Sequence, residues 1–163
     1  MKKAKSIFFY LLMICILLLS GFYRDFVFKR INALLQAWDH DMSYEMPNGL
    51  RFLENYDYDT IVNLKWLLTL LFSTLYLIIA IIVIRYAFHN KKYVKITVAS
   101  YAGIIVFSGI FIMTGLLFKG SSEKMYEFAR YFMGMAQSPI VLMVLIPAFT
   151  LYEKEKDKAQ RAE

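Results

Sequence analysis

Four long runs of apolar residues, uncharged except near their ends, constrain this chain more than any other feature. They cover residues 7–23, 64–88, 96–118 and 131–152. A helix of about 20 residues rises about 30 Å, which matches the hydrocarbon core of a bilayer. The sequence therefore predicts an all-α fold, an integral membrane four-helix bundle that forms a single domain.

Composition and charge agree with this prediction. Of the 163 residues, 59% are hydrophobic, and a soluble domain of this size has too little interior to bury so much apolar surface. The net charge of +6 does not indicate nucleic-acid binding, because the Lys and Arg residues flank the apolar runs. Cys15 is the only cysteine, which excludes an internal disulfide and a cysteine-based metal site. We expect no cofactor.

The basic residues also predict an orientation. The first run follows Met1-Lys2-Lys3-Ala4-Lys5 and is not followed by an Ala-x-Ala cleavage signal, so we expect a retained anchor. Lys and Arg are denser in the segments 1–6, 85–95 and 153–163 than in the intervening ones, and positive charge favours the cytoplasmic side. We therefore expect a bacterial inner membrane protein with both termini in the cytoplasm, an outer loop at 24–63 and a cytoplasmic tail at 153–163.

The outer loop begins with an amphipathic pattern. Five apolar residues recur there at helical spacing, namely Val27, Ile31, Leu34, Leu35 and Trp38. This pattern predicts an amphipathic helix. Such a helix can lie on the outer membrane surface or cap the bundle, and it can also present a docking surface to a partner protein. Both interpretations stay open at the level of sequence.

The second half of the outer loop is acidic. Asp39-His40-Asp41 contains ligand types that divalent cations accept, but its spacing matches no established metal loop. Adjacent side chains of an extended segment also point to opposite faces, so we expect a solvated loop and no metal site. Pro47-Asn48-Gly49 predicts a turn, and Asp59 or Thr60 is expected to cap the second spanning helix.

The interior of the four runs is polar in places but uncharged. No Asp, Glu, Lys, Arg or His lies near the centre of a run, which disfavours proton-coupled transport and intramembrane proteolysis. The sequence predicts no catalytic residue. Small residues at Ala99-x-x-x-Gly103 and Gly134-x-x-x-Ser138 are expected to let helices pack closely.

The least generic polar group consists of Arg130, Gln137 and Ser138. On a helix these residues share one face with Gly134. An arginine at the outer mouth of a bundle can bind a carboxylate or a lipid phosphate. It can equally pair with Glu127, three residues before it, or with the acidic loop. We therefore treat the three residues as a candidate ligand site.

Several segments resemble a known family. They are Lys-Trp-Leu-Leu-Thr-Leu-Leu-Phe at 65–72, Ala-Arg-Tyr-Phe-Met-Gly at 129–134, Gln-Ser-Pro at 137–139 and Ile-Pro-Ala at 146–148. These segments are similar to small exosortase-associated (exosortase F-associated-like) membrane proteins of the Bacteroidetes. Those proteins are encoded beside an exosortase, a membrane enzyme that cleaves C-terminal sorting tags from exported proteins. The resemblance implies an accessory protein, because this chain lacks the Cys–His part of the enzyme.

Three hypotheses for function follow. The favoured one is a non-enzymatic accessory or assembly subunit of a bacterial envelope complex, such as an exosortase protein-sorting system, bound to a larger membrane protein. The alternative is a small transporter or lipid-binding protein with a pocket near Arg130, Gln137 and Ser138. The third is an intramembrane enzyme with an acidic site around Asp39, His40 and Asp41.

Overall fold

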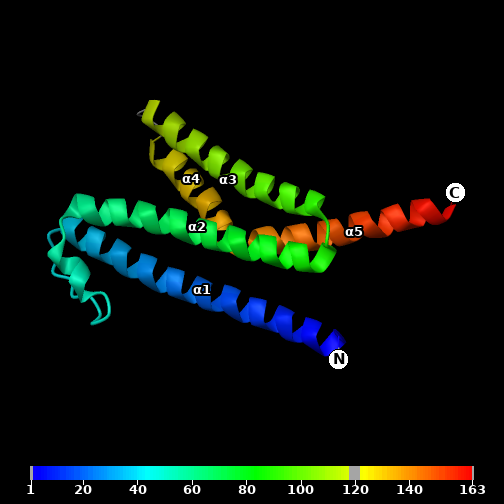
Figure 1. Cartoon of the computed structure of the whole chain (residues 1–163). Coiled ribbons are helices and arrows are strands. Elements are labelled where there is room, and N and C mark those ends of the chain that lie inside the picture. Colours follow the sequence, from blue (N-terminus) through cyan, green and yellow to red (C-terminus); the bar gives the residue numbers. More distant parts are fainter. Residues whose placement is uncertain (1, 118–121, 163) are drawn as a thin grey trace.

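The regular structure of this chain is helical throughout the part that is described. The computed structural model describes residues 2–117 and 122–162 (Figure 1). The elements are α1 (Lys2–Asp39), the short 3-10 helix η1 (Arg51–Asn55), α2 (Tyr58–Phe88), α3 (Lys91–Leu117), α4 (Ser122–Ala136) and α5 (Ile140–Ala162). The predicted all-α class is confirmed for these residues.

Helix length and hydropathy indicate a multi-pass membrane protein. Among the described residues, three helices are long and apolar enough to cross a membrane, namely α1, α2 and α3. The bent pair α4–α5 adds a fourth if it forms one span. A continuous fourth span at 131–152 was expected, and the bend divides it.

The helices run back and forth along one direction (Figure 1). The two ends of the chain lie at the same end of the bundle, which we call the termini end. The opposite end, called the loop end, holds residues 40–57 together with the end of α3 and the start of α4. Toward the loop end, α3 and α4 diverge from α1 and α2 (Figure 1).

The first helix is much longer than the sequence analysis predicted. Residues 24–39, expected to leave the membrane as an outer loop with its own helix, continue α1 without a break. Residues 22–39 contain neither proline nor glycine, so nothing in them ends a helix that is already formed. A lone glycine such as Gly21 weakens a helix by about 1 kcal/mol and does not end it.

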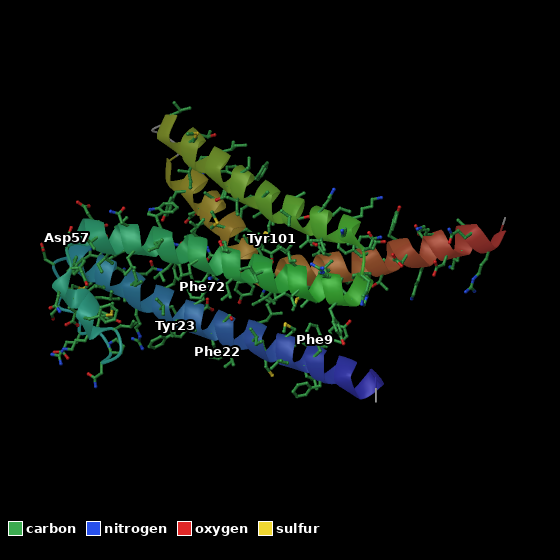
Figure 2. All side chains as sticks on the ribbon, viewed as in Figure 1. Phe9, Phe22, Tyr23, Asp57, Phe72 and Tyr101 are labelled. Atoms are coloured by element: carbon green, nitrogen blue, oxygen red, sulfur yellow. The ribbon has the colours of Figure 1, made fainter. Side chains whose placement is uncertain are left out.

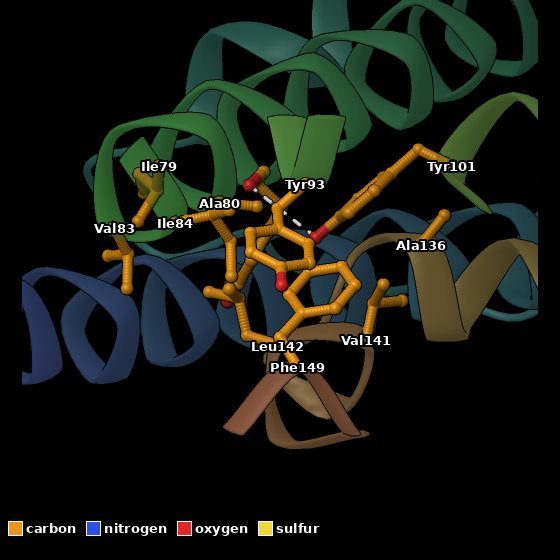
Figure 3. Close-up of a cluster of buried hydrophobic side chains, with 11 residues drawn as sticks. Ile79, Ala80, Val83, Ile84, Tyr93, Tyr101, Ala136, Val141, Leu142 and Phe149 are labelled. Carbon is orange, nitrogen blue, oxygen red and sulfur yellow. Dashed lines mark hydrogen bonds between the residues drawn. The ribbon is translucent and has the colours of Figure 1, made fainter. Parts of the chain in front are cut away.

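Two hydrophobic clusters hold the helices together. The larger one, called the main cluster, joins α2, α3, α5 and the last residue of α4 (Figure 3). In it the Tyr101 hydroxyl donates to the backbone oxygen of Tyr76 at 3.5 Å. The smaller one, called the loop-end cluster, consists of Val27, Ile31, Leu34, Leu35, Met46, Leu53 and Ile61.

The loop-end cluster explains the amphipathic pattern at 27–38. Val27, Ile31, Leu34 and Leu35 are buried, and Trp38 packs against them. Their cover is the chain's own loop and the start of α2, represented by Met46, Leu53 and Ile61. Four of the five residues expected to form a docking surface are therefore buried in the loop end of the chain itself, and Trp38 is partly buried against them.

The loop between α1 and α2 is fixed by polar contacts. The predicted turn is present, because the Leu50 amide donates to the Pro47 oxygen at 2.8 Å. The side chain of Glu54 accepts from the Met46 amide. The helix α2 starts earlier than expected: its cap is Asp57, which accepts from the Thr60 amide at 3.4 Å and lies at the loop end (Figure 2). The predicted caps Asp59 and Thr60 lie inside the first turn.

The bend between α4 and α5 falls at residues 137–139. The segments Lys124–Ala136 and Ile140–Arg161 meet at 59°. Ser138 ends one helix and starts the next, since its hydroxyl donates to the Met135 oxygen at 2.9 Å and accepts from the Ile140 amide at 3.4 Å. Pro139 has no amide hydrogen to satisfy at this position. The predicted tail is also helical, because α5 continues to Ala162.

The predicted small-residue contacts are partly wrong. Ala99 and Gly103 are exposed, and a Cβ added to Gly103 would meet nothing within 4 Å. Gly134 does admit a close neighbour, the guanidinium of Arg24, at 3.9 Å from an added Cβ. Among the glycines whose surroundings the structure describes, the tightest contact was not predicted. It lies at Gly21, where an added Cβ would be 3.2 Å from the hydroxyl of Tyr76.

We expect Gly21→Val to destabilise the fold and Gly103→Val to have little effect. The Tyr76 hydroxyl beside Gly21 donates to the Leu17 oxygen at 3.2 Å, so it is held in place. Overpacking of this kind costs about 1–3 kcal/mol. Unfolding in detergent, followed by helical circular dichroism, measures both variants against the parent. Equal losses in the two variants would contradict close packing at Gly21.

We expect the cap of α2 to depend on pH. Hydrogen bonding from the Thr60 side chain lowers the pKa of Asp57 below its ordinary value of 3.8. The cap is therefore fully present above that value and is lost as pH falls through the lowered pKa. Amide protection of Thr60, measured by NMR across acidic pH, should fall in the parent. It should stay nearly constant in Asp57→Asn, which caps without titrating.

Candidate functional site

A cleft of about 900 Å³ opens between α1, α2 and α4, with two residues of α3 in its wall. Most of its lining residues belong to the halves of α1 and α2 nearer the loop end and to α4, and toward that end α4 diverges from α1 and α2 (Figure 1). Sites for small organic ligands have volumes of about 300–1,000 Å³. The cleft therefore has room for such a ligand.

Three basic side chains line this cleft, one from each of its helices. They are Arg24 of α1, Lys65 of α2 and Arg130 of α4. Among the described lining residues, Glu127 is the one carboxylate. The remaining polar lining consists of Asn32, Tyr58, Thr69, Ser108, Tyr126, Tyr131, Gln137 and Ser138. The cleft thus carries an excess of positive charge.

Arg24 is held firmly at the wall of the cleft. Its Nε donates to Oε1 of Gln137 at 3.0 Å, and its Nη1 lies 3.5 Å from Oδ1 of Asp25. The guanidinium also lies over the ring of Phe28, 5.8 Å from the centroid. Its side chain is 23% exposed. Because a guanidinium has five N–H donors, these contacts orient the group and leave donors for a ligand.

Gln137 connects three helices at the floor of the cleft. Its side-chain oxygen accepts from Arg24 of α1, and its Nε2 donates to the backbone oxygen of Thr69 in α2 at 3.2 Å. Gln137 itself directly follows α4 and is 3% exposed. A buried amide with both ends bonded fixes the geometry around it. Gln137 therefore acts first as the residue that positions Arg24.

Arg130 is placed by the contact between α4 and α3. The buried Ser108 of α3 donates to the backbone oxygen of Ala129 at 2.8 Å. The ring of Phe111 stacks on Phe128 and Phe132, with both centroid distances 5.7 Å. These contacts hold one side of α4 against α3. Arg130 and Gly134 lie in the wall of the cleft.

The sequence-predicted site residues share this cleft but differ in role. Arg130, Gln137 and Ser138 all line it, together with Gly134. However, α4 ends at Ala136, so Gln137 and Ser138 reach the cleft from the bend and not from the predicted continuous helical face. The Ser138 hydroxyl is engaged in the bend. The alternative pairing of Arg130 with Glu127 is not formed within the described residues.

Sequence reasoning missed Arg24 and Lys65. It placed Arg24 in a loop and treated Lys65 as a marker of the membrane boundary. The signal for Arg24 was the unbroken helical pattern through residues 22–39, which puts Arg24 inside α1. The partner of Arg24 lies 113 residues away, and no local pattern reports such a contact.

The acidic segment of the loop has no comparable geometry. Asp39, His40 and Asp41 are all exposed. Within residues 2–117 and 122–162, no group of three His, Cys, Asp or Glu side chains lies close enough to hold a metal ion. The segment is therefore a solvent-exposed part of the loop without a metal-binding geometry among the described residues.

We expect Gln137→Leu to destabilise the protein, because it removes the acceptor that orients the half-buried Arg24. Hydrogen bonds to charged groups contribute about 1.5–3 kcal/mol. Gln137→Glu is the matched control, since it keeps an acceptor for Arg24, and the Thr69 oxygen still receives the Ser73 hydroxyl at 2.8 Å. Unfolding in detergent compares the two, and equal losses would contradict the role of this contact.

Searches with this chain found no matching family model, no matching curated protein and no matching solved structure.

Proposed function

We propose that this chain is a multi-pass membrane protein that binds an anionic ligand in the cleft between α1, α2 and α4, without catalysing a reaction. The observation that carries the proposal is the convergence of Arg24, Lys65 and Arg130 from three helices on one cleft. Three like charges repel one another in a partly apolar setting, and a bound phosphate or carboxylate relieves that repulsion.

The position of the cleft within the membrane supports the same proposal. Lys65 and Arg85 lie 20 residues apart on α2, which corresponds to about 30 Å of helix. Gln137, which holds Arg24, is bonded to Thr69, about 6 Å further along α2 than Lys65. With the loop end outside and both termini in the cytoplasm, the cleft opens at the outer boundary and reaches one helical turn into the apolar layer.

Binding fits the lining better than transport or catalysis. Among the described lining residues there is no His or Cys and only one carboxylate, so the acid–base pairs of hydrolytic sites are not assembled there. Toward the termini end, the bundle interior is filled by the main cluster, including the buried Tyr93, Tyr101 and Phe149 (Figure 3). This arrangement supports a site that is open at one end of the bundle only.

The accessory role predicted from the sequence is a second proposal. It rests on the resemblance to exosortase-associated proteins, and a ligand-binding accessory subunit would satisfy both. Purification of the tagged protein in mild detergent, followed by mass spectrometry of co-purifying membrane proteins, tests it. A stoichiometric larger partner supports the accessory role, whereas purification of the chain alone opposes it.

The fluorescence of Trp66, which lines the cleft, can report the binding of a ligand there. Of the two tryptophans in the chain, Trp66 lines the cleft, so Trp38→Phe leaves a single probe in place. We expect octyl phosphate to change the Trp66 fluorescence saturably, and octyl glucoside, a neutral amphiphile of equal chain length, to have no such effect. Arg24→Gln and Arg130→Gln should each weaken the response about tenfold, equivalent to about 1.4 kcal/mol.

Arg85→Gln is the matched control for these two variants. Arg85 is exposed near the opposite end of α2 and should leave the response unchanged. Equal responses to the two amphiphiles, or an equal loss in Arg85→Gln, would overturn anion binding in the cleft.

A further inference from the structure

The proposed function leaves open what kind of molecule carries the anionic group. Two sources share that chemistry: a soluble phosphate or carboxylate from outside, and the headgroup of a membrane lipid. The size, the depth and the rim of the cleft bear on this choice, and they favour the same source.

The size and wall of the cleft exceed what a bare anion requires. Its volume of about 900 Å³ is at the upper end of small-molecule sites. Next to the three cations, the wall is built from apolar and aromatic side chains. They include Phe28, Val62, Trp66, Ile112, Tyr131 and Ile140. A ligand that fills the cleft must therefore combine an anionic head with an apolar body.

The depth of the cations also points to an amphiphile. Arg24 is held about one helical turn inside the level of Lys65, beside Thr69 in the apolar part of α2. A soluble anion would have to give up its water to reach that depth. A lipid phosphate lies at the membrane boundary, level with Lys65 and about one helical turn from Arg24, and basic pockets between spanning helices bind such headgroups.

Three residues that line the cleft are also exposed at the surface of the chain, and we call them its rim. Trp66 of α2 is 47% exposed, Tyr131 of α4 is 73% and Ile140 of α5 is 44% exposed. Exposed aromatic residues at this depth are typical of contact with the interfacial region of lipid. The bend of 59° separates the direction of α4 from that of α5 beside this rim.

We propose that the ligand is an anionic phospholipid of the outer leaflet, which enters sideways past Trp66, Tyr131 and Ile140. Its phosphate is bound by Arg24, Lys65 and Arg130, and its acyl part lies against the apolar wall. This inference rests on the proposed function and narrows it to a lipid.

The test measures quenching of Trp66 by brominated lipid in nanodiscs. The Trp38→Phe protein is placed in phosphatidylcholine discs that contain a small fraction of phosphatidylglycerol or phosphatidylcholine with brominated acyl chains. We expect brominated phosphatidylglycerol to quench Trp66 at about a tenfold lower mole fraction than brominated phosphatidylcholine. Arg24→Gln/Arg130→Gln should abolish this preference, and Arg85→Gln should keep it.

A tryptophan moved by one residue controls for lipids that merely surround the protein. Leu67 is exposed, at nearly the same depth as Trp66, and does not line the cleft. In the variant Trp38→Phe/Trp66→Phe/Leu67→Trp, we expect both brominated lipids to quench equally. A preference of equal size at both positions overturns the inference, since it reports general attraction of anionic lipid to a basic protein.

The remaining outcomes separate this inference from the proposed function. If octyl phosphate alters Trp66 fluorescence but brominated phosphatidylglycerol shows no preference there, the site binds an anion and the lipid assignment is overturned. If neither probe acts on Trp66, the lipid assignment and the anion site both fail. Selective quenching at Trp66 that depends on Arg24 and Arg130 supports both.

Discussion

In an apolar phase every backbone polar group must find its partner within the protein, and the break between α4 and α5 is where this chain meets that constraint most directly. Ser138 supplies two of the required bonds there, and the amides of Gln137 and Ser138 still reach the carbonyls of the last turn of α4. The side chain of Gln137 then bonds outward to α1 and α2. The position of Arg24, and with it the cleft, depends on this one interruption.

The apolar clusters and the polar cleft lie at different levels along the bundle. Apolar contacts are concentrated in the main cluster toward the termini end and in the loop-end cluster at the other end. The polar cleft lies beside α1 and α2 between these levels, so neither core has to accommodate a charge. In the described part of the chain, no buried side-chain nitrogen or oxygen lacks a hydrogen-bond partner. Burying a polar group costs little free energy when it is hydrogen-bonded in this way.

Much of the architecture could be predicted because it follows from local patterns. Apolar runs of spanning length predicted the helices, and the helical pattern placed Arg130 and Gly134 on one face, which forms part of one wall of the cleft. The end of the first apolar run does not end the helix α1, so Arg24 was placed in a loop. The amphipathic face at 27–38 was recognised, but a helical pattern does not tell whether lipid, a partner or residues 46–61 cover it. Gly21 and Lys65 gain their roles only from residues on other helices, which no single segment reveals.

The length of α5 gives the interruption at 137–139 a mechanical consequence. Its 23 residues span about 35 Å, from the bend beside Gln137 to the termini end, where the helix projects (Figure 1). A rotation of about 10° at the bend would carry the far tip through about 6 Å, given that rise per residue. Partway along α5, the Tyr93 hydroxyl of α3 donates to Glu153 at 2.7 Å and holds the two helices together. Any change of angle at the bend must therefore also move Phe149 within the main cluster and disturb the Tyr93–Glu153 contact.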